Sequence, residues 1–225
     1  MRENLEARLI LLNGACSAGK SSLAHELQNL LVEPNIFLGI DAYHLAIPKE
    51  KLNLREPDQN YLWPEQWVDK GETMTLVRRG PLIKKIDEAR FLSTRHFLNQ
   101  GISVIADEVF WELDDIKRFL RLMQGLNVLL VKVNVKEKLG EERIALRSKI
   151  LKGDVENFST NFRPEGMCRA SSRLVHKYME YDLFIDTSKD DPLTCAQHLY
   201  ECIGKLAKPS AFIKLINRYG PFLQN

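Results

Sequence analysis

The stretch that decides the fold lies near the start of the chain and reads Gly14-Ala15-Cys16-Ser17-Ala18-Gly19-Lys20-Ser21. It matches the pattern G-x-x-x-x-G-K-[ST], in which a glycine-rich backbone turns its N–H groups inward around a phosphate. A short apolar run from 8 to 13 precedes the match, and a segment with helical spacing follows it from 20 to 32. Because strand, loop and helix come in this order, we expect a phosphate-binding loop whose following helix offers its positive end to the anion.

Each residue type in this loop has an expected task. The lysine, Lys20, would reach the β- and γ-phosphates as a point charge and take part in catalysis. The hydroxyl of Ser21 would be a ligand of Mg²⁺. We therefore predict ATP and Mg²⁺ as cofactors, and the predicted nucleotide-binding residues are Gly14, Ala15, Cys16, Ser17, Ala18, Gly19, Lys20, Ser21 and Ser22.

Outward from the loop, strand-like and helix-like segments alternate along the chain. Strands are expected at 8–13, 36–40, 102–106, 127–135 and 181–187, and helices at 20–32, 81–100, 113–124, 136–151, 166–178 and 191–206. This alternation predicts an α/β fold, a parallel sheet with helices on both faces. Together with the phosphate loop and the charged segment after the fourth strand, we expect the P-loop NTPase or kinase type with a charged helical lid. We expect a kinase domain over 1–207, with a lid at about 136–165, a proline-rich insertion at about 48–80 and a tail at 208–225.

Composition excludes several classes of protein. The chain has 225 residues, 44% hydrophobic and 28% charged, with 32 Lys and Arg against 30 Asp and Glu. This balance excludes a long disordered chain and disfavours nucleic acid or an anionic membrane as the main partner. No apolar run approaches the ~20 residues that span a bilayer, and the run from 9 to 12 is too short for a signal-peptide core. Four scattered cysteines without a CxxC pair complete the expectation of a cytoplasmic protein.

Acidic residues follow two of the expected strands. Asp41 comes directly after 36–40, and Asp107-Glu108 comes directly after 102–106. In open α/β sheets the ligand binds beyond the carboxyl ends of the strands. Asp41 could therefore act as the general base that accepts a proton from an attacking hydroxyl, and Asp107 could hold Mg²⁺ through water. Helix capping or a surface ion pair is the alternative for each of them, and the choice between Asp107 and Glu108 as the metal carboxylate stays open.

The segment from 136 to 152 is highly charged. Such a run is commonly a solvated helix with ion pairs between residues four apart. In a small kinase the same run can be a lid that brings arginines onto the transferring phosphoryl group. Arg143 and Arg147 lie four residues apart, on one helix face, and are candidates for that catalytic role.

Further motifs occur in order along the chain from about 9 to 188. They are Ile10–Ser21, Gly39-Ile40-Asp41 with Ala46-Ile47-Pro48, Asp107-Glu108-Val109-Phe110, and Gly166-Met167, Val175-His176, Tyr181-Asp182 and Ile185-Asp186-Thr187. Together they resemble the chloramphenicol phosphotransferases, whose corresponding motifs read "IILNGxSSAGKS", "GVD" followed by "AMP", "DDVF" and "GM…VH…YD…VDT". These proteins are P-loop kinases of small-molecule hydroxyls.

The resemblance implies a function and a set of site residues. It implies Asp41 as the base, Mg·ATP on the loop, transfer to a primary hydroxyl of an antibiotic, and a role in antibiotic resistance. In the family the lid arginines come from an "R…RGDR" segment. Arg143 and Arg147 match its first part and Arg163 its last arginine, whereas 148–161 looks like an insertion, within which Asp154 offers a rival alignment.

The region from 49 to 80 has no counterpart among these motifs. It contains Tyr61, Trp63 and Trp67. Aromatic side chains can line an apolar substrate pocket, or they can belong to the core and the loops. The resemblance therefore supports the kinase chemistry more strongly than it supports the antibiotic as the substrate.

Three functions remain open at this point. The first is an ATP-dependent O-phosphotransferase acting on a small hydroxyl compound. The second is a kinase of a macromolecule, a protein or an RNA end, for which Lys51, Arg55 and the lid could form a basic patch. The third is a non-catalytic ATP-binding module that controls a partner through the apolar stripe of 209–225. The expected partners are ATP and a small-molecule hydroxyl, with no membrane, nucleic acid disfavoured, and an oligomer left open.

Overall fold

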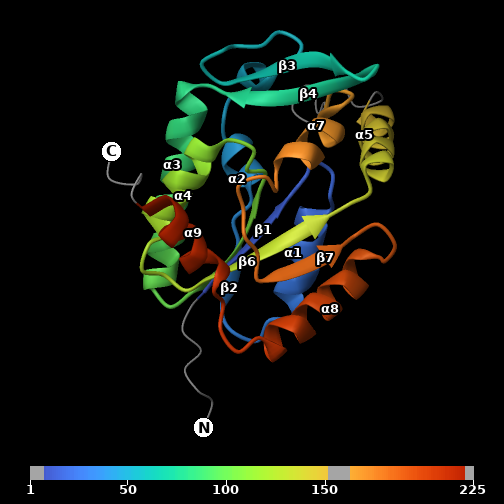
Figure 1. The fold of residues 1–225 in the computed structure, drawn as a ribbon. Helices are drawn as coiled ribbons and strands as arrows, with labels where there is room; N and C mark the ends of the chain where they lie inside the picture. Colours follow the sequence, from blue (N-terminus) through green and yellow to red (C-terminus); the bar gives the residue numbers. More distant parts are fainter. Residues whose placement is uncertain (1–7, 152–162, 221–225) are drawn as a thin grey trace.

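The computed structural model describes residues 8–151 and 163–220, and its centre is a parallel sheet (Figure 1). In this described part of the chain the main sheet has five strands in the order β2-β5-β1-β6-β7. The strands are β1 (Leu9–Gly14), β2 (Asn35–Phe37), β5 (Ser103–Glu108), β6 (Val128–Asn134) and β7 (Leu183–Asp186). The predicted fold class is thereby confirmed.

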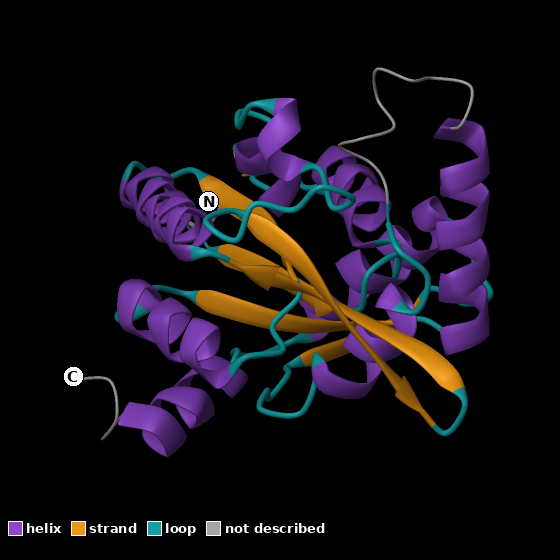
Figure 2. Cartoon of the chain, turned by 90° about the horizontal axis from the view of Figure 1, so that it is seen from above, coloured by secondary structure: helices purple, strands orange, loops and turns teal. Residues whose placement is uncertain are grey.

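Helices cover both faces of this sheet, as the view from above shows (Figure 2). α1 (Lys20–Leu30) and α8 (Pro192–Lys205) pack on one face. α3 (Pro81–Asn99), α4 (Leu113–Met123) and α9 (Ala211–Tyr219) pack on the other. Every residue of β1 is buried, which explains why its sequence is apolar without alternation.

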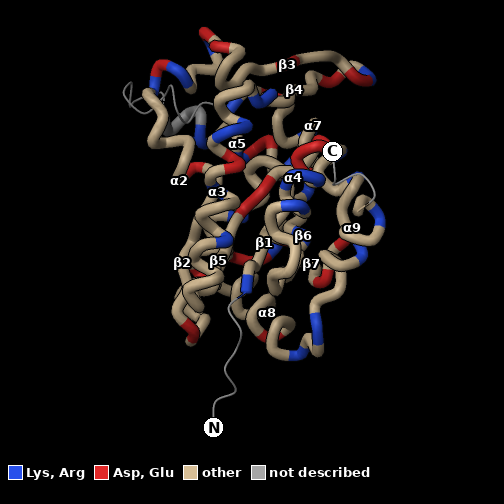
Figure 3. The backbone as a smooth tube through the Cα atoms, turned by 90° about the vertical axis from the view of Figure 1, so that its left-hand side faces the viewer, with Lys and Arg blue, Asp and Glu red and all other residues tan. Residues whose placement is uncertain are grey.

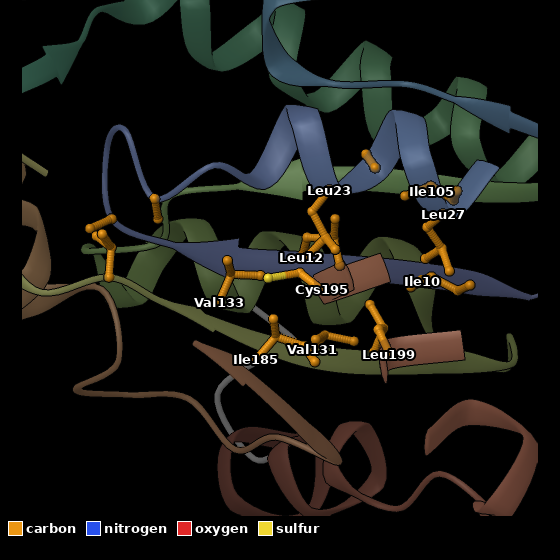
Figure 4. Close-up of a cluster of buried hydrophobic side chains, with 14 of the residues drawn as sticks. Ile10, Leu12, Leu23, Leu27, Ile105, Val131, Val133, Ile185, Cys195 and Leu199 are labelled. Atoms are coloured by element: carbon orange, nitrogen blue, oxygen red, sulfur yellow. The ribbon is translucent and has the colours of Figure 1, made fainter. Parts of the chain in front are cut away.

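The side chains of β1 divide between the two cores by strand periodicity. Ile10 and Leu12 face α1 and α8, where Leu23, Leu27 and Leu199 pack around them (Figure 4). Leu9 and Leu11 point to the opposite core, which is built from α3, α4 and α9. Strand β1 is therefore clamped from both sides, and the loop that follows it starts from a rigid position.

The proline-rich insertion forms an element that the sequence did not predict. β3 (Leu62–Asp69) and β4 (Glu72–Arg79) make an antiparallel hairpin beyond the carboxyl ends of the main strands (Figure 1). Its two-residue turn has positive φ at both central positions, Lys70 (51°) and Gly71 (82°), as a type I′ hairpin requires. Pro64 and the run of exposed residues in β3 conceal the strand because they remove the usual apolar alternation.

The second predicted strand was too long. β2 ends at Phe37, and the short helix α2 (Ile40–His44) begins where the strand was expected to finish, so Asp41 lies in a first helical turn. The cause is at Gly39, where an added Cβ would lie 2.8 Å from the Asp107 carboxylate. That carboxylate can therefore accept the backbone N–H of Ile40 at 3.0 Å, which starts the helix. A short 3₁₀ helix, η1 (Lys49–Leu52), follows.

The predicted lid corresponds to α5 (Glu137–Leu151), and the next described helix is α7 (Met167–Leu174), which is shorter than predicted. Residues 152–162, with most of the expected insertion and Asp154, lie outside the described residues.

The apolar stripe of the tail lies on the chain's own body. Phe212 and Leu215 of α9 are buried in the core formed with α4 and β6. The carboxylate of Asp182 accepts the backbone N–H groups of Ser210 and Ala211 at 2.6 and 2.8 Å and so satisfies two backbone donors at the start of this helix. Within the described ranges, none of the helices is both long and apolar enough to cross a membrane.

Candidate active site

The shape of the glycine-rich loop requires glycine at both of its ends and depends on contacts with neighbouring elements. Gly14 ends β1, and a Cβ there would lie 2.2 Å from the Val133 carbonyl oxygen. Gly19 ends the loop with φ of 80°, and the first residue of α1 follows it. On the outer side, the backbone N–H of Cys16 donates to the hydroxyl of Ser171 in α7 at 3.0 Å. The loop is thus shaped by β1, β6 and α7 together.

The side chains predicted to bind phosphate and Mg²⁺ lie together at the start of α1. The Lys20 ammonium is buried and donates to the carbonyl oxygens of Gly14 and Ala15 at 3.0 and 2.8 Å. The Ser21 hydroxyl donates to Oδ2 of Asp107 at 2.9 Å. A hydroxyl and a carboxylate side by side are the oxygen ligands that Mg²⁺ prefers, so this pair fits the ion.

The hydroxyl of Ser17 is a further indication that the loop binds a ligand. Its oxygen is buried, and no hydrogen-bond partner for it exists among the described residues. Ser17 has φ of 60° and lines two hollows beside the loop, of about 190 and 240 Å³. A buried hydroxyl without a partner is uncommon in proteins, and an oxyanion at this loop would satisfy it.

A cavity of about 190 Å³ opens on the inner side of the loop. Its walls come from segments that are far apart in sequence. They are the loop (16–22), α2 with Asp41 and His44, the insertion with Leu52, Leu54, Leu62, Val77 and Arg79, the segment after β5 with Val109 and Trp111, and the lid side with Arg147, Arg163 and Met167. One half of the cavity is therefore polar and charged, and the other half is apolar except for Arg79.

The predicted base and two of the predicted arginines share this cavity. Asp41 is exposed, and its Oδ1 lies 3.8 Å from Nη2 of Arg163. Arg147 of α5 lines the same space. The geometry brings together a carboxylate, the phosphate loop and two cations, which is what an in-line phosphoryl transfer requires.

Arg143 lies on the other side of the loop. Its guanidinium donates to the carbonyl oxygens of Ser17 and Thr187 at 3.2 and 2.8 Å. There it lines a second hollow of about 240 Å³, together with Ser22, Leu23, Arg147, Asp190 and Pro192. The structure therefore separates Arg143 from Arg163, although the sequence grouped them.

A buried charged cluster lies behind the apolar half of the cavity. Glu108 is fully buried and forms an ion pair with Arg90, while Arg79 faces Asp87, Asp115 and Glu108 at 3.3, 3.5 and 3.9 Å. Burial raises the pKa of Glu108 in spite of the two arginines. Burial also acts on Asp87, but Arg79, His44 and Arg90 outweigh it and lower the pKa of Asp87 to about 2. Glu108 is thus engaged with Arg90 and Arg79, whereas Asp107 is the carboxylate that contacts the Ser21 hydroxyl.

Charges of both signs are otherwise interspersed along the chain (Figure 3). The hairpin is joined to α5 and α7 through such pairs. Arg173 of α7 contacts Asp69 and Glu72 of the hairpin at 2.8 Å each, and Glu137 of α5 at 3.4 Å. Exposed pairs of this kind contribute little each, about 0–1 kcal/mol, but they link three elements around the cavity.

Comparison with known proteins shows the family of the chain. The family model described as "Chloramphenicol phosphotransferase-like protein" matches residues 7–203. The chain belongs to the chloramphenicol phosphotransferase-like family. Two curated relatives, from two strains of Mycobacterium tuberculosis and each named "Putative O-phosphotransferase", are 34% identical over 215 residues, which cover 95% of this chain and 90% of the relative. The chain is accordingly a phosphotransferase of the kinase type.

Solved structures agree in fold. A sugar kinase from Janibacter has a TM-score of 0.56 at 13% identity, covering 88% of this chain and 95% of its own. The APS kinase CysC of Mycobacterium tuberculosis, in complex with AMPPNP and APS, has a TM-score of 0.55 at 12% identity and covers 88% and 98%. A gluconokinase from Sinorhizobium meliloti has a TM-score of 0.54 at 13% identity and covers 90% and 94%. At these identities the comparison shows only that the chain shares the fold of these P-loop kinases.

Several cavity residues escaped the sequence analysis. The insertion lines the cavity with aliphatic side chains and Arg79, whereas Tyr61 packs in a separate cluster with Ile47 and Ile83, and Trp67 is exposed on the hairpin. Trp111 was missed although it comes four residues after Asp107, where the chain leaves β5. Lys70-Gly71 was the signal that could have found the hairpin, and with it Arg79 at its end.

Proposed function

We propose that this protein transfers the γ-phosphoryl group of Mg·ATP to a hydroxyl of a small, chloramphenicol-like molecule, with Asp41 as the general base. One observation carries the proposal: Asp41 and the phosphate loop line a single cavity whose remaining walls are largely apolar. A cavity of this kind suits a compound with an apolar body and a few polar groups.

In this proposal the phosphates lie on the loop and on the N-terminus of α1. The loop N–H groups and Lys20 bind them, and the second hollow, beside Arg143 and Pro192, receives the nucleobase. Ser21 and Asp107 would hold Mg²⁺, which supplies charge neutralisation at the phosphates. Asp107 is the better candidate of the acidic pair because Glu108 is engaged with Arg90.

The acceptor hydroxyl would lie beside Asp41 on the opposite wall. The Asp41 carboxylate takes the hydroxyl proton as the oxygen attacks phosphorus, a contribution of about 10²–10⁴ in rate. Arg147 and Arg163 would stabilise the charge that develops on the transferring group. The family consists of phosphotransferase-like proteins, so we set aside the alternative of a non-catalytic nucleotide-binding module. A macromolecular acceptor is the alternative that a negative test with small molecules would favour.

Mass spectrometry tests the proposal directly. The protein is incubated with Mg·ATP and chloramphenicol, and in parallel with a panel of small apolar alcohols, with Lys20→Ala as the inactive control. The expected product carries one added phosphoryl group and is absent from the control. Unmodified acceptors throughout, with ATP bound, would reject the small-molecule assignment and leave the kinase fold in place.

A further inference from the structure

Asp87 lies outside the cavity and touches two of the side chains that line it. This α3 residue is 1% exposed. Its Oδ1 lies 3.4 Å from Nε2 of His44, and its Oδ2 lies 3.3 Å from Nη1 of Arg79. The two partners come from different walls, His44 from α2 and Arg79 from the end of β4. A single buried carboxylate therefore joins the helix that carries Asp41 to the hairpin.

Helix α2 depends on this contact. Of its five residues, all of which the structure describes, His44 alone is buried, and Asp41 is exposed to the cavity. A helix of this length is not stable by itself in water. Its first residue is held by the bond from the Ile40 N–H to Asp107, and its last by the pair between His44 and Asp87. The position of Asp41 is thus set by two carboxylates, one at each end of α2.

The second contact of Asp87 fixes the apolar wall. Arg79 is buried, faces Asp115 and Glu108 as well, and lies over the ring of Trp111 at 5.5 Å. Since Arg79, His44 and Arg90 outweigh burial and lower the pKa of Asp87, its carboxylate is ionised at neutral pH. The ion pair with the Arg79 guanidinium therefore requires no change in the protonation of Asp87.

We propose that Asp87 is a positioning residue for phosphoryl transfer, which holds Asp41 in place through His44 and holds the acceptor wall in place through Arg79. This inference rests on the proposed function, because the task of Asp41 is defined there. Asp87 lies apart from the glycine-rich loop, so its influence falls on the acceptor side and leaves nucleotide binding alone.

The test is a comparison of Asp87→Asn with the wild type. Turnover is measured with Mg·ATP and chloramphenicol, or as ATP hydrolysis by water if the drug is not phosphorylated. Displacement of a reacting group by about 1 Å costs up to 10²-fold, so a loss of about tenfold or more is expected in kcat. The dissociation constant of a non-hydrolysable Mg·ATP analogue should remain at the wild-type value. Equal kcat in the two proteins would overturn the proposal.

Two further variants separate positioning from general stability. Asp115→Asn removes another buried carboxylate beside Arg79, but the partners of Asp115 are Arg79 and Arg118, so kcat is expected to stay within about threefold of the wild type. His44→Ala removes one of the two contacts of Asp87 and should show a part of the loss seen in Asp87→Asn. The double variant should be no worse than Asp87→Asn, because the contact with His44 is already lost there. Equal losses in Asp115→Asn and Asp87→Asn, or additive losses in the double variant, would overturn it. His44→Ala keeps the test valid if Asp87→Asn does not fold.

Failure of the proposed function would be visible separately. Asp41→Asn is measured in the same assay. If Asp41→Asn turns over as fast as the wild type, the assignment of the base has failed, whatever Asp87→Asn shows. If Asp41→Asn is inactive while Asp87→Asn matches the wild type, the base stands and the positioning role of Asp87 is rejected.

Discussion

The two halves of the cavity are built by different means. The nucleotide half is one continuous stretch, from β1 through the loop into α1. It is fixed by the close contact at Gly14, by the positive φ of Gly19 and by buried strands on both sides. The acceptor half is assembled from five separate segments, in α2, the insertion, the end of β5, α5 and the region before α7. Backbone shape and apolar packing hold the first half, whereas buried charges and hydrogen bonds between distant segments hold the second.

The difference teaches where a local motif suffices and where it does not. A phosphate is bound by N–H groups of consecutive residues, so the fold of a few residues creates the site. An acceptor is recognised by side chains from several elements, and its site exists only when those elements are held in register. Changes in the nucleotide half should therefore abolish binding and chemistry together, and changes in the acceptor half should affect chemistry alone.

The largest effect is expected from Lys20→Ala in the nucleotide half. It removes the buried ammonium at the loop, so Mg·ATP affinity and turnover should both fall, turnover by about 10²–10³-fold. Titration with a non-hydrolysable ATP analogue and the transfer assay measure the two effects. Lys51→Ala is the matched control, since this exposed lysine pairs with Asp58 and should change neither value. Normal nucleotide affinity in Lys20→Ala would contradict the assignment of the loop.

The fold and the nucleotide half could be predicted from sequence because their signals are local. Gly14–Ser21 lies between an apolar run and a segment with helical spacing. All three can be identified from consecutive residues, without knowledge of their tertiary contacts. Asp41 and Asp107 were placed by the rule on strand ends, although Asp41 turned out to lie in a helix that Asp107 itself starts.

The acceptor half was not predictable in the same way. Arg79, Trp111 and Asp87 carry no motif, and the sequence left open whether the aromatic residues of the insertion line a pocket or belong to the core and the loops. Their meeting depends on the hairpin, whose strand β3 is exposed and interrupted by Pro64, so its sequence lacks alternation. The separation of Arg143 from Arg163 likewise follows from tertiary contacts with Ser17 and Thr187.

A smaller loss of turnover than that of Lys20→Ala is expected from Gly166→Ala in the acceptor half. Gly166 has φ of 79°, and a Cβ would lie 2.2 Å from the Thr73 carbonyl oxygen of the hairpin. The substitution should lower the free energy of unfolding by about 1–3 kcal/mol and shift Arg163, with a loss of turnover of about tenfold and unchanged nucleotide affinity. Gly71→Ala has nearly the same φ, 82°, in open space, and should leave turnover at the wild-type level. Equal turnover in both variants would refute this reading of Gly166.

A smaller effect is expected from Thr75→Val, which weakens the same junction. The buried Thr75 hydroxyl donates to the carbonyl oxygen of Glu165 at 2.7 Å and accepts from the side chain of Gln66 at 3.0 Å. Its loss should cost about 1–3 kcal/mol of stability, measured by urea unfolding, because buried polar groups are left unpaired. Thr75→Ser keeps the hydroxyl and should recover most of that stability. Equal stability of the valine and serine variants would show that the hydroxyl contributes nothing.

The smallest effect is a pH dependence of stability in the nucleotide half. Burial, with help from Lys132 and Lys20, lowers the pKa of His176 from 6.5 to about 4. The neutral ring accepts at Nδ1 from the Tyr181 hydroxyl, which in turn accepts from Asn13 at the end of β1. Since the unfolded chain binds the proton first, the free energy of unfolding should fall as pH drops from 6.5 to 4. The decrease should be shallower in His176→Gln, and parallel profiles for the two proteins would contradict it.

Asp41→Asn tests the central claim most directly, because it separates the two halves at the reacting atoms. Nucleotide affinity and phosphoryl transfer are measured on the same preparation of this variant and of the wild type. The account predicts transfer reduced by about 10²-fold or more with Mg·ATP affinity nearly intact. Transfer at the wild-type rate would contradict it, since the cavity would then perform its chemistry without a base at Asp41.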